Sequence, residues 1–352
     1  MTTEIAGERT STAMQEVLIS ADSHTMEHPD LWKERLELRF RGQAPQFTAN
    51  EVSGFAAHPG GNDPSERIKE MGEDGVSAEV LYPTLGLRLF GIQDAKLQEA
   101  CFRVYNDWVM EYCKVAPDRL VGVSMISTYD IDEAIKEVER TAKGGLKGAL
   151  VWQVPPADLP FTSDHYDRLW AAAQEADVAI SLHILTGFGY SKNLASLKGL
   201  DLIRHSVNTK IYEASNALYD LIFSGVLDRF PRLKIVFVEN EVGWMPFAVE
   251  QWDRYYKRFQ ERLDLNLSML PSEYVRRQVY STFFNDPSGG FLLSYWGEEN
   301  CMWSNDYPHP NSTWPNSRDV IGRQLAHLSE ETRAKVVRGN VMRLYGLQAP
   351  GA

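Results

Sequence analysis

The sequence is poor in cysteine and in long apolar runs. Three of its 352 residues are cysteines, and they show no CxxC spacing, so Cys101, Cys113 and Cys301 are interpreted as structural thiols in a reducing compartment. No apolar run is long enough to cross a bilayer, and the polar first residues lack the apolar stretch of a signal peptide. We therefore expect a cytoplasmic protein without a membrane span.

The sequence also lacks an excess of positive charge. The 48 acidic residues outnumber the 36 Lys and Arg residues, so the formal net charge is −12. A nucleic-acid partner is not expected, because neutralising phosphates requires a basic face. Hydrophobic residues make up 43% of the chain and charged residues 24%, which is typical of a folded globular protein.

Short apolar runs alternate with longer amphipathic stretches along the chain. This rhythm predicts βα units with a parallel sheet, because strands buried on both faces are almost continuously hydrophobic. Eight strands are expected, over 17–21, 78–83, 121–127, 148–153, 179–184, 234–239, 279–284 and 301–306. Helices are expected within 94–116, 130–144, 163–177 and 241–263. The predicted fold is a (β/α)8 TIM barrel.

Two segments interrupt the alternation, residues 28–70 after the first strand and residues 185–215 after the fifth. Loops at the carboxyl ends of barrel strands face the active site, so both insertions are candidate lids or substrate walls. No linker divides the chain, and one domain over 1–352 is predicted, with residues 1–15 as a flexible tail. Asp130 and the run 162–164 are expected to cap helices, and Gly144 to end one.

Four side chains that can bind a metal follow predicted strands. Asp22 and His24 are two residues apart, so their side chains point to the same side of an extended chain. His183 and Asp306 lie at the ends of the fifth and eighth predicted strands. Each residue alone is weak evidence, because a DxH pair is common by chance and most histidines near strand ends are simply hydrogen-bonded. Their joint placement predicts one divalent ion, with zinc expected from the mixed N/O ligands and manganese or iron as alternatives.

Several segments resemble the amidohydrolase superfamily, in particular the family that includes aminocarboxymuconate semialdehyde decarboxylase. The similar segments are ISADSHTMEHPDLW, VLYPT, SLHI, FVENEVGWMPFAVEQWDR, SNDYPHPNSTWPNS and GNVMRLYGL, which span Val17 to Leu347 in the family's order. The resemblance implies a metal-dependent barrel whose metal ligands here are Asp22, His24, His183 and Asp306. Asp22 stands where the family has His or Glu, which leaves open whether it binds directly or through water.

The resemblance also places Glu239 where the family has an acid–base histidine on strand six. As a carboxylate near a cation, Glu239 suits a fifth ligand or a general base, while a structural role at the rim remains an alternative. Glu241 could take over either role. His309, held between Pro308 and Pro310, is predicted to reach the substrate or Asp306, although turn packing would also explain it. The expected catalytic residues are therefore Glu239, Asp306 and His309.

Substrate contacts are predicted from the long segment after strand five and from aromatic residues near strand ends. Arg204 and His205 are candidates for binding a substrate carboxylate. Aromatic residues that could line an apolar pocket, or only pack the core, are Tyr82, Trp152, Phe188, Tyr190, Trp244 and Trp314. The other histidines, His28, His58, His165 and His327, are interpreted as structural or solvent-facing.

By analogy with the resembled family, the expected function is nonoxidative decarboxylation of a small aromatic or unsaturated carboxylic acid. The alternative is a hydrolase of C–N, C–O or C–C bonds that uses metal-activated water, with Glu239 as the base. A metal-free binding or scaffold barrel is a third reading, which the complete set of ligands disfavours. A small-molecule substrate is the expected partner, and a homodimer is expected through the tryptophan-rich segment 244–252.

Overall fold

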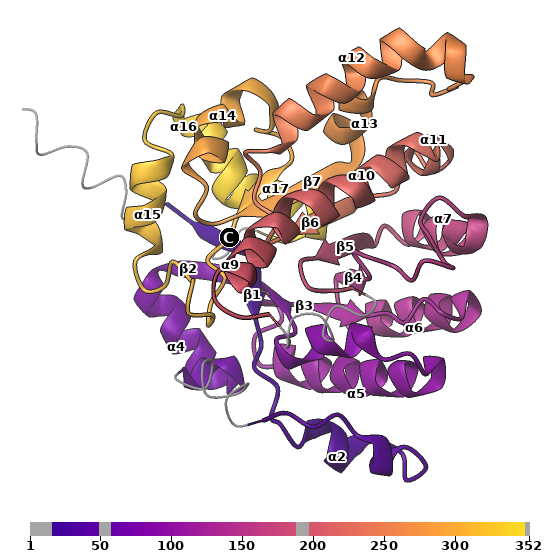
Figure 1. Cartoon of the computed structure of the whole chain (residues 1–352). Coiled ribbons are helices and arrows are strands. Elements are labelled where there is room, and N and C mark those ends of the chain that lie inside the picture. Colours follow the sequence, from indigo (N-terminus) through magenta and orange to yellow (C-terminus); the bar gives the residue numbers. More distant parts are fainter. Residues whose placement is uncertain (1–15, 49–57, 188–196, 349–352) are drawn as a thin grey trace, which may run out of the picture.

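Eight parallel strands form a nearly closed barrel with helices around its outside (Figure 1). The computed structural model describes residues 16–48, 58–187 and 197–348. The strands lie in chain order, each paired with the next: β1 (Leu18–His24), β2 (Val76–Tyr82), β3 (Leu120–Met125), β4 (Gly148–Val151), β5 (Ala179–His183), β6 (Ile235–Val238), β7 (Val279–Phe283) and β8 (Cys301–Trp303). The predicted (β/α)8 barrel is confirmed.

The connections between the strands are largely helical. The α-helices are α2 (Leu31–Arg35), α4 (Pro64–Asp74), α5 (Ala95–Cys113), α6 (Ile131–Lys143), α7 (Asp167–Glu175), α9 (Leu200–Asn208), α10 (Ala214–Phe223), α11 (Val226–Arg229), α12 (Met245–Leu263), α13 (Pro271–Gln278), α14 (Pro287–Trp296), α15 (Ser317–Gln324), α16 (Glu330–Ala334) and α17 (Asn340–Tyr345). Short 3-10 turns are η1 (Arg41–Gln43), η2 (Pro59–Gly61), η3 (Leu85–Gly91) and η4 (Asp164–Tyr166), and π-helical turns are η5 (Thr209–Glu213) and η6 (Lys335–Gly339).

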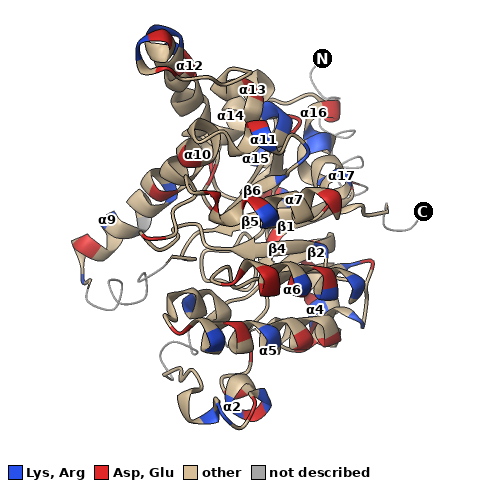
Figure 2. Cartoon of the chain, turned by 90° about the vertical axis from the view of Figure 1, so that its right-hand side faces the viewer, with Lys and Arg blue, Asp and Glu red and all other residues tan. Residues whose placement is uncertain are grey.

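The strands are buried on both faces, as their nearly continuous hydrophobicity predicts. Their inward residues fill the barrel and their outward residues pack against the helices. On the outer helices α5 and α6, acidic and basic residues are interspersed (Figure 2). Among the described residues, no helix combines the length and the apolar character that a membrane span requires.

Helix boundaries follow the predicted caps in part. The Asp130 side chain accepts hydrogen bonds from the backbone N–H groups of Asp132 and Glu133 at the start of α6, and Gly144 ends that helix. The prediction of a side-chain cap at 162–164 is wrong. Ser163 precedes only the 3-10 turn η4, and its hydroxyl donates back to the Pro160 carbonyl instead.

The first and last strands differ from their predicted lengths. β1 continues through the polar residues Asp22 to His24, which hydrophobicity did not mark as strand. Asp22 and His24 face the site, and the Ser23 hydroxyl donates to Asn305 on the other side of the strand. β8 ends at Trp303, three residues before Asp306. Past that end, the Asp306 N–H donates to the Asp22 carbonyl (3.1 Å) and the His24 N–H to the Tyr307 carbonyl (2.6 Å). These bonds join β8 to β1 and bring Asp306 beside the Asp-Ser-His segment.

The two segments predicted as insertions also contain helices. Residues 28–70 hold α2, η1, η2 and the first turns of α4, and residues 185–215 hold α9, all of η5 and the first two residues of α10. Helix α9 projects from the barrel in Figure 2, and in Figure 1 it runs on into α10 across the rim. Residues 49–57 and 188–196 of these segments, and the predicted tail 1–15, lie outside the described residues.

Candidate metal centre

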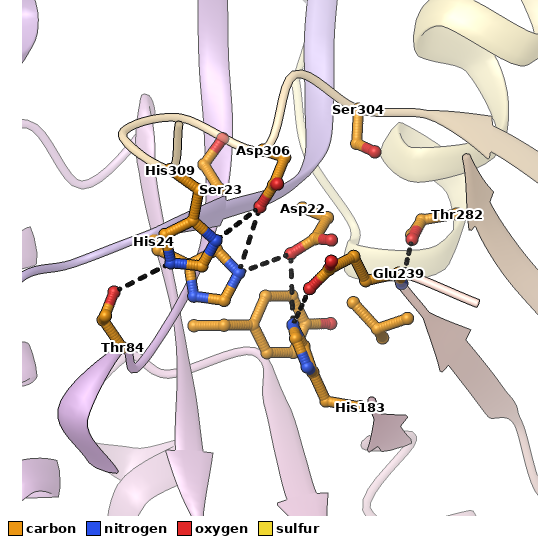
Figure 3. Close-up of polar contacts among 12 residues, drawn as sticks. Asp22, Ser23, His24, Thr84, His183, Glu239, Thr282, Ser304, Asp306 and His309 are labelled. Carbon is orange, nitrogen blue, oxygen red and sulfur yellow. Dashed lines mark hydrogen bonds and ion pairs between the residues drawn. The ribbon is translucent and has the colours of Figure 1, made fainter. Parts of the chain in front are cut away.

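The predicted ligands converge at the carboxyl-terminal rim of the barrel (Figure 3). His24 ends β1, His183 ends β5, Glu239 follows β6 directly, and Asp306 follows β8. Asp22 lies two residues before His24 on β1, so both side chains point into the same space. Ligand atoms of two overlapping sets, Asp22/His24/His183/Glu239 and His24/Glu239/Asp306/His309, lie within 4.8 Å of one another in each set.

The separations between these atoms fit a shared cation better than hydrogen bonds. Asp22 Oδ1 lies 3.5 Å from His24 Nε2 and 3.6 Å from His183 Nε2, and His24 Nε2 lies 3.5 Å from Asp306 Oδ1. Two ligands at 2.0–2.1 Å from a tetrahedral zinc are about 3.4 Å apart, whereas a hydrogen bond would bring them to about 3 Å. The residues present therefore fit a divalent metal ion.

The hydrogen bonding of the ligands supports the same conclusion. His24 Nδ1 contacts the Pro83 carbonyl at 2.8 Å, and His183 Nδ1 contacts the Ile184 carbonyl at 2.7 Å. Each bond places the ring proton on Nδ1 and leaves Nε2 free to bind metal. Among the described residues, both Nε2 atoms and both carboxylate oxygens of Asp22 are buried without a hydrogen-bond partner. Buried polar atoms usually have partners, so several unpaired ligand atoms gathered in one place indicate a site for a bound group.

The carboxylates of the site carry more negative charge than the nearby basic side chains neutralise. Burial, together with the neighbouring Asp22 carboxylate, holds the pKa of Asp306 well above its usual range. Burial also lowers the pKa of His24, and a proton on His309 or His183 would lower it further, so His24 is neutral as a ligand must be. For His183, burial works in the same direction, but Asp22 and Glu239 outweigh it and the pKa is raised. A bound cation would relieve the repulsion among these carboxylates.

Three acidic residues of the rim have a strained backbone. Glu239, Glu241 and Asp306 have φ angles of 59°, 56° and 56°, in the left-handed region that normally favours glycine. Such residues cost on the order of 1 kcal/mol each and cluster at functional sites. Burial raises the pKa of Glu239 and that of Glu241 to about 7. Both carboxyl groups can therefore gain or lose a proton near neutral pH.

His309 lies against the ligand set, as its position three residues after Asp306 predicted. Its Nδ1 is 2.9 Å from Asp306 Oδ1, its Nε2 is 3.2 Å from the Thr84 hydroxyl, and its ring stacks on His24 with centroids 3.9 Å apart. Burial lowers the pKa of His309 to about 4, so the imidazole is neutral. These contacts suit a residue that orients Asp306 and covers His24.

Two basic residues near the site were missed from the sequence. Lys210, in the π-helical turn η5, places its Nζ 3.7 Å from Glu239 and 3.6 Å from Glu241. Arg67 of α4 is fully buried behind β1, where its Nη1 donates to the His24 carbonyl at 2.7 Å and its Nε to Glu79 at 2.5 Å. No motif marks a single Lys or Arg on an amphipathic helix, so only the packing of these helices reveals either role.

The aromatic candidates lie in different surroundings. Tyr82 is fully buried, with its ring centroid 5.3 Å from that of His183 and its hydroxyl bonded to Ser181 and Tyr345. The Trp152 indole donates to the Phe90 carbonyl, and half-buried Trp244 donates to the Asn240 carbonyl. Phe188 and Tyr190 lie outside the described residues. Of these residues, Tyr82 lies against the ligand histidines, and a substrate contact stays a prediction for all three of Tyr82, Trp152 and Trp244.

The polar candidates on α9 lie near the surface. The side chain of Arg204 is 70% exposed and pairs with Asp201 at 3.4 Å. His205 is half-buried, and its carbonyl accepts a hydrogen bond from the Thr209 hydroxyl. Neither belongs to the two sets of converging ligand atoms. Their predicted contact with a substrate carboxylate stays a prediction.

The histidines interpreted as structural have contacts of that kind. His58 packs against Trp314 and Tyr307, and His165 Nε2 contacts the Thr128 carbonyl at 2.7 Å. Trp314 also donates to the Glu70 carbonyl, so its ring belongs to this packed layer. The remaining two are His28, which accepts the Asp30 N–H, and His327, whose ring lies 5.5 Å from that of Phe291.

Sequence relatives of the chain are decarboxylases. The 2-amino-3-carboxymuconate-6-semialdehyde decarboxylase of Dictyostelium discoideum is 24% identical over 294 residues, which cover 81% of this chain and 77% of the relative. The gamma-resorcylate decarboxylase of Rhodococcus jostii (strain RHA1) is 26% identical over 304 residues, covering 80% and 87%. These proteins resemble the chain over most of both lengths.

Solved structures share the fold. An amidohydrolase from Mycobacterium avium subsp. paratuberculosis superposes with a TM-score of 0.77 at 21% identity, over 94% of this chain and all of the other. A variant of 5-carboxyvanillate decarboxylase from Novosphingobium aromaticivorans, crystallised with manganese and 3-methoxy-4-hydroxy-5-nitrobenzoic acid, has a TM-score of 0.75 at 17% identity, over 98% of this chain and all of the other. A family model described as amidohydrolase matches residues 23–347, and the chain therefore belongs to the amidohydrolase family.

Proposed function

We propose that this protein is a metal-dependent decarboxylase of a small aromatic or unsaturated carboxylic acid. The observation that carries the proposal is the set of buried atoms at the barrel rim, two imidazole Nε2 atoms and the Asp22 carboxylate, which converge without hydrogen-bond partners among the described residues. The relatives also support the proposal, because the gamma-resorcylate and carboxymuconate-semialdehyde decarboxylases resemble the chain over most of its length.

In this proposal Asp22, His24, His183 and Asp306 hold the metal. The bound metal would act as a Lewis acid that binds the substrate's carboxylate and stabilises negative charge as carbon dioxide leaves. Zinc is the metal expected from the ligands, and manganese is the ion bound in the Novosphingobium enzyme, so the two are the first to compare.

Glu239 is the residue that we assign to proton transfer. Its Oε2 lies 3.9 Å from His183 Nε2 and thus faces the ligand set, while its backbone N–H is fixed by the Thr282 hydroxyl at 2.9 Å. Loss of carbon dioxide from an unsaturated carbon leaves an electron pair that must take up a proton. In the metal-free protein burial raises the pKa of Glu239 to about 7, which makes this carboxyl group our candidate to supply that proton and to take it back from solvent afterwards.

A hydrolase is the second candidate, and one observation favours it. Glu239 replaces the histidine that the resembled family carries at this position, and a carboxylate is a natural base for activating a water molecule. In that reaction Glu239 would begin ionised and end protonated, the reverse of its part in decarboxylation.

The experiment compares both reactions on one preparation. The protein loaded with Mn²⁺ or Zn²⁺ is incubated with gamma-resorcylate, 5-carboxyvanillate and neutral ester analogues, while carbon dioxide release and products are followed. We expect release from at least one acid, and Glu239→Gln should retain metal while turnover falls roughly 100-fold or more. Hydrolysis of the esters without carbon dioxide from any acid would replace the proposal with the hydrolase.

We also propose that the protein is a cytoplasmic homodimer. The support is the absence of a membrane-spanning helix among the described residues and the large exposed side chains along α9, α10 and α12, such as Ile203, Tyr219 and Phe247. Sedimentation at working concentration tests the dimer, and a single species of about 40 kDa, the mass of one 39.9 kDa chain, would contradict it.

A further inference from the structure

The turn η5, between β5 and β6, places the Lys210 side chain at the acidic rim. Helix α9 passes through the π-helical turn η5 into α10, and such wide turns change which face of a helix its side chains occupy. Within the turn, Ile211 and Tyr212 are 40% and 61% exposed, whereas the Lys210 side chain is 23% exposed and turned inward. The π turn therefore separates an outward apolar face from a lysine that reaches the site.

The ammonium of Lys210 lies between two glutamates. Its Nζ is 3.7 Å from Glu239 Oε1, 3.6 Å from Glu241 Oε1 and 5.0 Å from the centre of the Phe284 ring. The two glutamates are alternate residues, and both have left-handed φ angles. This backbone conformation turns both carboxyl groups toward the same cation.

The opposite oxygen of Glu239 faces the metal ligands. While Oε1 lies beside Lys210, Oε2 lies 3.9 Å from His183 Nε2. Asp22 and Asp306 add two more carboxylates nearby, and like charges at these distances repel one another. Without a cation at Oε1, the Glu239 side chain would be free to turn away from the ligand set.

We propose that Lys210 is a positioning residue whose ammonium bridges Glu239 and Glu241 and holds the Glu239 carboxyl toward the metal ligands. The consequence for proton transfer rests on the function proposed above, but the placement of Glu239 does not. Lysine is suited to this task because its compact charge has three donors, enough for both carboxyl groups. The turn η5 thereby becomes part of the reactive site.

The test uses Lys210→Met, which keeps the length of the side chain and removes its charge, and Lys210→Arg, which keeps the charge. Lys198→Met is the matched control, because Lys198 is exposed on the same connection. Crystal structures of the manganese-loaded proteins report the Glu239 position, and calorimetry reports Mn²⁺ binding. If Lys210→Met does not fold, Lys210→Gln gives the same readouts with a neutral donor.

We expect Lys210→Met to keep its manganese while Glu239 Oε2 leaves its place beside His183, and Lys210→Arg to restore that place. With an acid that the wild type decarboxylates, kcat should fall about tenfold or more in Lys210→Met, KM should change less than about threefold, and Lys210→Arg should recover most of the loss. Lys198→Met should match the wild type throughout.

Two results would overturn the inference. If Glu239 keeps its place in Lys210→Met, Lys210 does not position it. If instead KM rises with kcat retained, Lys210 binds the substrate's anionic group. The crystallographic result requires no turnover, so a protein that decarboxylates none of the acids would defeat the proposed function and leave this test intact.

Discussion

The two sides of the candidate metal centre are held in different ways. Behind β1 and β8, Glu79 accepts from buried Arg67 at 2.5 Å and from Asn305 at 3.0 Å, and Asn305 in turn accepts from the hydroxyls of Ser20 and Ser23. On the β5–β6 side, Glu239 lies 3.7 Å from Lys210 and 3.9 Å from His183. The first side has the short contacts of a rigid network, and the second has longer separations between charges.

This difference matches two different tasks. Metal ligands must be held in one geometry before the metal binds, and the carbonyl of His24 is held by Arg67 at 2.7 Å. A group that transfers protons must change its charge during each reaction cycle, and longer contacts tolerate that change. We infer that the β1/β8 side is preorganised and that the Glu239 carboxyl group on the β6 side is adjustable, while His183 is fixed through its Nδ1 by the Ile184 carbonyl at 2.7 Å.

The largest expected effect comes from breaking the rigid side. Arg67→Met should lower the free energy of unfolding by about 3–5 kcal/mol, because it leaves the fully buried Glu79 carboxylate without its guanidinium partner. Urea unfolding measures the loss. The control is Arg35→Met, whose partner Glu111 is 56% exposed, and which should cost less than about 1 kcal/mol. Equal losses in the two variants would show that the buried Arg67–Glu79 pair stabilises the fold no more than an exposed ion pair does.

The next effect tests the metal ligands on both sides. His183→Ala and Asp306→Asn should each weaken metal binding roughly 100-fold or more, because each removes a proposed direct ligand. Metal analysis after dialysis against a weak chelator measures the loss. His165→Ala is the control, since that ring bonds to the Thr128 carbonyl and does not belong to the converging ligand sets. Retention of a full equivalent by both variants would refute the proposed ligand set.

The smallest effect sharpens the description of the adjustable side. Burial raises the pKa of Glu241 to about 7, above the 4.5 of an unfolded glutamate. The folded metal-free protein therefore binds more protons than the unfolded chain between pH 4.5 and 7, and this group lowers stability as the pH rises through that range. Glu241→Gln should match the wild type below pH 4.5 and be more stable by on the order of 1–2 kcal/mol at pH 8.

Urea unfolding of the two metal-free proteins at pH 5, 6, 7 and 8 provides the measurement. A stability difference that grows with pH would support a carboxyl group that is costly to ionise. A difference that is constant with pH would contradict this. It would mean that Lys210 stabilises the ionised Glu241 carboxylate in the folded protein as well as water does in the unfolded chain.

Much of the fold was predictable because short apolar strands and amphipathic helices alternate regularly along the sequence of a parallel barrel. Buried strands are nearly continuous in hydrophobicity, so all eight were found in order, and Asp130 was recognised as a cap from its type and place. The errors came where polar residues belong to strands, as with Asp22 to His24 in β1, or where a capping residue bonds elsewhere, as with Ser163. Local pattern cannot separate these cases, because tertiary contacts decide them.

The sequence by itself determined that Asp22, His24, His183 and Asp306 meet, because the carboxyl ends of parallel barrel strands share one rim. Only the tertiary structure decided how that rim is supported. Arg67 lies on α4, and the way this helix packs against the barrel decides where its long side chain ends. Lys210 lies in the π-helical turn η5, which changes the face of the helix from which its side chain projects. Such contacts join residues far apart in the chain through distances of a few ångströms, and no local spacing encodes them.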